Sequence, residues 1–247
     1  MKYIRLCTIL KFLPIILLGF FLLPLVPSRA AVDLNTILPN DFDPSLLQEH
    51  FQNDHYGFLL DKRGCLRSIH NAGGVVLFRK VGEWIIQGTP KEGPDKFTYD
   101  GGIPTGPELT VVKTKDEAGN PVFNYVNANM SNFVLWGLKV TCLPTKIVLE
   151  YNMKITQDLP HGVDTNFILP IDTNKEMMED GFNAEPGNPL VFNFKSGTAT
   201  VAFDQKFVWY GTPGYNASAG GATFYLDFGG TKTVGGSETL RFEIEVP

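Results

Sequence analysis

Residues 239–246 are Thr-Leu-Arg-Phe-Glu-Ile-Glu-Val, and this alternation of polar and apolar residues decides the fold class of the chain. Successive side chains of an extended strand point to opposite faces, so the apolar residues share one face and the polar residues share the other. One dry face and one wet face are typical of strands in antiparallel sheets. The stretch therefore predicts an antiparallel β-strand that covers a core.

The same period of two recurs along most of the chain. It is clear at 134–142, 146–155, 190–194 and 224–228, and shorter candidates lie at 57–61, 64–70, 75–79, 82–87, 108–115, 121–127, 164–171, 197–203 and 206–210. Short glycine-containing turns join several of them, at 61–64, 118–121 and 195–197. Strands in this number, without a sequence repeat, predict an all-β fold: a large antiparallel two-sheet β-sandwich.

One short N-terminal helix is expected before the strands begin. Asp43 precedes Pro44, which is the order of an N-cap residue followed by proline at the first helical position. Apolar residues and one histidine then share a helical face, and these are Leu46, Leu47, His50 and Phe51. The sequence predicts a helix over 44–52 within a leader, 31–54, and a sandwich domain over 55–247.

The first thirty residues are expected to be a secretory signal peptide. Basic residues precede an apolar run at 12–26, and small residues at 28 and 30 suit a signal peptidase. An uncleaved membrane anchor is the alternative, but the run falls short of the roughly 20 apolar residues that a spanning helix needs. The mature chain is expected to begin near Ala31 and to be secreted, in the extracellular space or a periplasm, with no membrane span of its own.

Composition limits the partners. Of the 247 residues 43% are hydrophobic and 19% are charged, which supplies a sizeable core and excludes a disordered chain. The net charge of the whole chain is −5, and removing the four basic residues of the signal leaves 17 basic against 26 acidic residues, or −9. A domain this acidic lacks a surface that neutralises phosphates, so a nucleic-acid partner is not expected.

Cys65 and Cys142 are the two cysteines that remain after removal of the signal. An exported pair can form a disulfide, which would stabilise the fold by roughly 4 kcal/mol in the chain-entropy model. The alternative is two buried thiols that pack as small apolar residues. The sequence leaves both interpretations open.

Three stretches resemble one known family. Residues 64–71 (GCLRSIHN) with 73–78 (GGVVLF) are similar to the first hairpin of the galactose mutarotase-like supersandwich domains. Residues 167–170 (FILP) resemble the central strand of that family, and 236–242 (GSETLRF) its closing strand. The resemblance implies a supersandwich that binds or acts on carbohydrate. Epimerases of the family have two separated histidines and a glutamate base, whereas three of the four histidines here precede residue 71, so no catalytic residue carries over.

Aromatic residues near glycine are the candidates for sugar contact, because a sugar ring needs a flat apolar face and planar polar groups. The segment 207–216 (FVWYGTPGYN) supplies Trp209, Tyr210, Tyr215 and Asn216. Trp84 precedes a second break, at 88–107, that is rich in glycine and proline. The alternative for each aromatic residue is a place in the core.

Histidines offer two further hypotheses. His161 lies in a turn three residues before Asp164, and the two could act as a general acid and base, or His161 could be a solvated loop residue. His50 and His55 flank Asp54 and could share a metal ion, although no cysteine or third ligand accompanies them.

Asp172, Asn174 and Glu176 place oxygen ligands at alternate positions, as a calcium-binding loop does. An EF-hand is excluded, because Met177 stands where glycine is required and Asn183 where glutamate is expected. A Ca²⁺ site of another kind and a solvated acidic loop are the two remaining interpretations. No other cofactor is expected.

The chain lacks the Gly-x-Ser-x-Gly, P-loop, dinucleotide-binding and His-Glu-x-x-His signatures. The leading hypothesis is a secreted, non-catalytic β-sandwich that binds a poly- or oligosaccharide. One alternative is a carbohydrate-active enzyme (a polysaccharide lyase, an epimerase or a relative of glycoside hydrolases) that uses His161 and nearby acids. A second alternative is a structural or adhesion module that binds protein.

Overall fold

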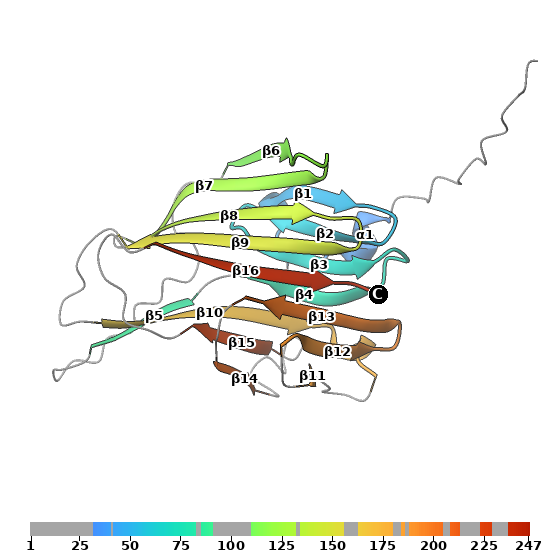
Figure 1. Cartoon of the computed structure of the whole chain (residues 1–247). Coiled ribbons are helices and arrows are strands. Elements are labelled where there is room, and N and C mark those ends of the chain that lie inside the picture. Colours follow the sequence, from blue (N-terminus) through green and yellow to red (C-terminus); the bar gives the residue numbers. More distant parts are fainter. Residues whose placement is uncertain are drawn as a thin grey trace, which may run out of the picture. The chain divides into compact units, whose positions relative to one another are not determined.

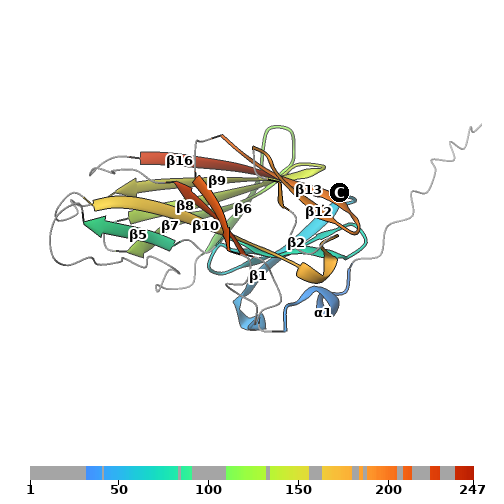
Figure 2. The same ribbon diagram turned by 90° about the horizontal axis from the view of Figure 1, so that it is seen from below.

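The chain divides into two units, Met1–Ala30 and Ala31–Pro247. The computed structural model describes residues of the second unit, namely 32–40, 42–82, 85–90, 110–131, 134–155, 163–179, 184–185, 188–204, 208–212, 223–228 and 237–247. These residues form two antiparallel eight-stranded sheets that enclose one hydrophobic core (Figures 1 and 2).

The first sheet has the order β1-β2-β3-β4-β10-β15-β14, and β5 also pairs with β10. Its strands are β1 (Leu47–Gln52), β2 (Tyr56–Asp61), β3 (Leu66–Asn71), β4 (Val76–Val81), β5 (Ile85–Pro90), β10 (Val163–Thr173), β14 (Val208–Thr212) and β15 (Thr223–Phe228). The long strand β10 pairs with β5 through its first half and with β4 through its last three residues. The sheet is therefore extended beyond β4 by a second group of strands.

The second sheet has the order β11-β12-β13-β16-β9-β8-β7-β6. Its strands are β6 (Val111–Lys115), β7 (Pro121–Ser131), β8 (Val134–Cys142), β9 (Lys146–Ile155), β11 (Ala184–Glu185), β12 (Leu190–Phe194), β13 (Gly197–Phe203) and β16 (Ser237–Glu245). Residues 239–245 of the alternating stretch belong to β16, which lies between β13 and β9, and Val246 follows directly after the strand. Its apolar residues are buried in the core, so the predicted fold class, an all-β two-sheet sandwich, is confirmed.

The helix expected over 44–52 is wrong in position. Asp43 does cap a turn, because its carboxylate accepts the amide of Ser45, but that turn is a short 3-10 helix, η1 (Pro44–Leu46). The next six residues form β1, which pairs with β2. The one short α-helix among the described residues, α1 (Leu34–Ile37), lies earlier in the chain. Pairing with β2 satisfies more backbone groups than a marginal helix of two turns could.

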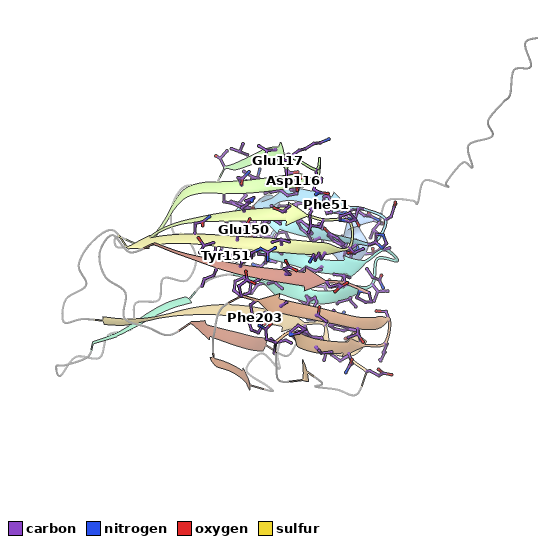
Figure 3. All side chains as sticks on the ribbon, in the orientation of Figure 1. Phe51, Asp116, Glu117, Glu150, Tyr151 and Phe203 are labelled. Carbon is purple, nitrogen blue, oxygen red and sulfur yellow. The ribbon has the colours of Figure 1, made fainter. Side chains whose placement is uncertain are left out.

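Aromatic side chains fill the core between the sheets. Phe51 of β1 packs against Phe58 and, edge-on, against Phe123 of β7, with ring centroids 5.3 and 6.2 Å away (Figure 3). Phe78 of β4 meets Phe192 of β12 edge-on at 5.2 Å. The Phe51–Phe123 and Phe78–Phe192 pairs each join a strand of the first sheet to a strand of the second, so the two sheets share one packed interior.

The segment before β1 covers the side of the first sheet that is turned away from the core. The hydroxyl of Ser68 donates to the carbonyl of Ile37, and the amide of Val32 donates to the side chain of Gln52 at 3.0 Å. The guanidinium of Arg67 lies over the ring of Phe42, 5.7 Å from its centroid. Figure 2 shows α1 beyond β1 and β2 as seen from β16. Ile37 is consequently buried although it lies outside the main core.

Candidate functional site

Two of the aromatic candidates for sugar contact lie on β14. In register, Trp209 is opposite Leu226 of β15, and Tyr210 is opposite Tyr225. Among the described strands β14 pairs with β15 alone and ends the first sheet. The other residues predicted for this site, Tyr215, Asn216 and Trp84, lie outside the described residues.

The local sequence explains why this segment is a strand. Val208, Trp209 and Tyr210 are β-branched or aromatic, the residue types that favour extended structure. Its partner β15 has the same character, with the sequence TFYLDF. A terminal strand leaves one row of backbone N–H and C=O groups without a partner strand. Aromatic residues and backbone hydrogen-bonding groups therefore occur together at this edge.

The predicted acid and base pair is described only in part. Asp164 belongs to β10, where it is opposite Thr89 of β5. His161 lies outside the described residues. The catalytic role of the two residues stays a prediction.

The residues predicted to bind calcium lie at the end of β10 and directly after it. Asp172 is near the end of β10, opposite Lys80 of β4, and Glu176 is exposed in η2 (Lys175–Met177). The side-chain amide of Asn174 donates to the carbonyl of Val76 at 3.0 Å, and its backbone amide donates to Leu77. Asn174 therefore fastens η2 to β4, and calcium binding by this set stays a prediction.

The cysteines are not bonded to each other, so the disulfide is corrected in favour of two buried thiols. Cys65 follows the β2 turn, where its amide donates to the carboxylate of Asp61 at 2.9 Å. Cys142 ends β8 in the second sheet and lies close to the hydroxyl of Tyr56. Burial raises the pKa of the Cys142 thiol to about 12, so the thiol is neutral and packs as a small apolar group.

His50 and His55, the two histidines that could share a metal ion, lie in different elements of the structure. His55 and Asp54 are exposed in the loop after β1, whereas His50 lies in β1 beside His70 of β3, with ring centroids 6.3 Å apart. Sequence reasoning missed this pair, because it placed His50 on a helix. Alternation within 47–52 would have been the signal, since it sets His50 apart from the core-facing Phe51.

Charged residues on the outer face of the second sheet neutralise one another. The ammonium of Lys139 lies 2.8 Å from the carboxylate of Glu150, which Figure 3 labels on β9. Glu243 of β16 accepts from both Lys146 and Arg241 at 2.5 Å. The hydrogen bond from Lys146, with Arg241 beside it, lowers the pKa of Glu243. These carboxylates are held as ion pairs, which suits a solvated surface.

Among the described residues, no three His, Cys, Asp or Glu side chains come together as a group that could hold a metal ion. None of the helices described is long and apolar enough to cross a membrane.

Comparison with known proteins finds a distant likeness of fold. No family model matches the chain, and no curated protein matches it in sequence. The chain resembles the solved structure of a galactose mutarotase-related enzyme from Lactobacillus acidophilus, at 9% sequence identity and a TM-score of 0.44. The likeness covers 81% of this chain and 97% of that enzyme. What this chain binds has to be inferred from its own residues.

Proposed function

We propose that this chain is a secreted β-sandwich protein that binds a neutral poly- or oligosaccharide and does not act on it. The observation that carries the proposal is the position of Trp209 and Tyr210 on β14, the terminal strand of the first sheet as described. Aromatic residues offer flat apolar faces to sugar rings. The unpaired backbone groups of a terminal strand offer hydrogen-bonding partners to sugar hydroxyls.

The charge of the domain supports a neutral ligand. Without the proposed signal the chain carries −9, and a surface of that sign repels uronates and sulfated sugars. Export is proposed from the basic and apolar pattern of residues 1–30. Both points are inferences from the sequence.

One panel of glycans and polysaccharides tests the proposal, with each ligand offered in calcium and again in chelator. Binding of a neutral glycan, without new reducing ends or unsaturated products, is the expected result. New reducing ends or unsaturated sugars would show an enzyme instead, and His161 and Asp164 would then be its candidate catalytic residues. No binding to any glycan would overturn the proposal in favour of a protein ligand.

A further inference from the structure

His50 and His70 form a pair of rings whose Nε2 atoms are buried and have no partner. His70 is fully buried, and the Nε2 atoms of both rings are closed to solvent and make no hydrogen bond. The ring centroids are 6.3 Å apart. Burying a polar atom without a partner is unfavourable, so two such atoms on neighbouring rings require an explanation.

The backbone of β2 is shaped to let the two rings approach. His50 lies on β1 and His70 on β3, and Gly57 of β2 is opposite His70 in register. A Cβ atom at Gly57 would lie 2.4 Å from Cε1 and 2.5 Å from Nε2 of His70. The inner edge of the His70 ring therefore lies over Gly57, on the way to β1. A residue with a side chain at 57 would close this path.

The protonation of His70 is set by its outer nitrogen. Nδ1 lies 2.9 Å from the carbonyl oxygen of Asn71, so Nδ1 carries the proton and donates it to that oxygen. Nε2 of the neutral ring then keeps its lone pair. Burial lowers the pKa of both histidines, which favours the neutral rings. A histidine that donates Nδ1–H to a carbonyl is arranged as metal-binding histidines usually are.

We propose that Nε2 of His50 and Nε2 of His70 bind one monovalent copper ion between them. Metal–imidazole bonds of about 2.0 Å place two ring centroids about 6 Å apart when the bonds are opposed, and about 5 Å apart at a tetrahedral angle. The observed 6.3 Å fits opposed bonds. Zinc in a structural site takes four ligands, and the described residues hold no group of three, whereas monovalent copper accepts two.

The segment before β1 is hydrogen-bonded to β3 close to His70. Ile37 is buried there, and its carbonyl is held by Ser68 two residues from His70. The exclusion of water protects monovalent copper from competing ligands and stabilises two-coordination. Loading therefore needs a local opening of the fold, since the Nε2 atoms of both rings are closed to solvent.

The proposal is tested by anaerobic titration of the full chain with monovalent copper against a chromogenic chelator of that ion. One equivalent is expected to bind. His50→Gln and His70→Gln are each expected to weaken binding about tenfold or more, since even second-layer groups of a metal site are worth that much. His55→Gln, at an exposed position, is the matched control and is expected to bind as the parent chain does.

X-ray absorption of the loaded chain separates this site from the thiols of Cys65 and Cys142, which are softer ligands. Nitrogen alone around the copper is expected. Sulfur bound to the copper, less than one equivalent of binding, or full binding by His50→Gln would each overturn the proposal. Because His50 is only half-buried, His50→Gln keeps the test decisive if His70→Gln fails to fold.

Discussion

The hydroxyl of Tyr56 donates hydrogen bonds to the carbonyl oxygens of Leu143 and Lys146, at 2.8 and 3.0 Å. Tyr56 belongs to β2 of the first sheet, and both carbonyls flank the turn between β8 and β9 of the second sheet. The amide of Asn53 reaches the same turn, donating to Pro144 at 3.1 Å. One corner of the sandwich is thus joined by polar bonds as well as by the core.

Tyr56→Phe should destabilise the fold by about 0.5–1.5 kcal/mol, because it removes the hydroxyl that donates to the two carbonyls, each of which keeps one other donor. Urea unfolding of parent and variant measures the loss. Val112→Ala, at an exposed position on β6, is the control and should change stability by less than about 0.5 kcal/mol. Equal stability of Tyr56→Phe and the parent would show that the bonds across the corner contribute nothing.

Gly57→Ala should destabilise the fold by about 1–3 kcal/mol, as overpacking of a tight site does. The added methyl group meets the ring of His70, so the loss should shrink when His70→Ala removes that ring. A double-mutant cycle in urea measures this coupling, and residues in contact typically give about 0.5–3 kcal/mol. Strictly additive losses would mean that the two residues do not compete for space.

Glu243→Gln should lower stability at neutral pH by up to about 1 kcal/mol, since it removes two partly exposed ion pairs, with Lys146 and with Arg241. The pKa of Glu243 is lowered in the fold, chiefly by the hydrogen bond from Lys146, so its contribution is present above the unfolded value of 4.5. That contribution is lost as the pH falls through the folded pKa. Urea unfolding at pH about 7 and again at acid pH should show the gap between parent and variant closing. A gap that is the same at both pH values would contradict this.

The three cysteines of the chain should all react with a thiol reagent after unfolding without reductant, because Cys65 and Cys142 are not bonded. In the folded chain Cys142 should be unreactive, since it is buried and its pKa is raised to about 12. Reaction of a single cysteine in the unfolded chain would show that the pair is oxidised.

The sequence predicted most of the sheet structure because strand alternation is a local property. Stretches such as 146–155 and 190–194 have one face that is apolar along its whole length, and both are strands. The helix prediction for 44–52 was wrong because the residues of this segment satisfy a helical period as well as an extended one. Only the presence of β2 decides between them, and a partner strand cannot be seen in the segment itself.

A candidate site could be predicted from the sequence only where its residues are close together in the sequence. Trp209 and Tyr210 are neighbours in sequence, so the aromatic strand could be predicted. The pair of His50 and His70 could not, because it depends on a register that places residues twenty positions apart on β1 and β3, on either side of Gly57 in β2. The neutral thiol of Cys142 likewise depends on burial, which the folded chain creates and the local sequence does not show.

The measurement that tests the proposed function most directly is calorimetric titration of a neutral glycan, chosen from the panel, into the parent chain and into a Trp209→Ala, Tyr210→Ala double variant. The parent chain should bind the glycan without product formation. The double variant should bind at least about tenfold more weakly, since stacked aromatic residues carry much of the binding energy at such sites. Val112→Ala should bind as the parent does, and unchanged urea midpoints should show that all chains are folded. Undiminished binding by the folded double variant would contradict the account.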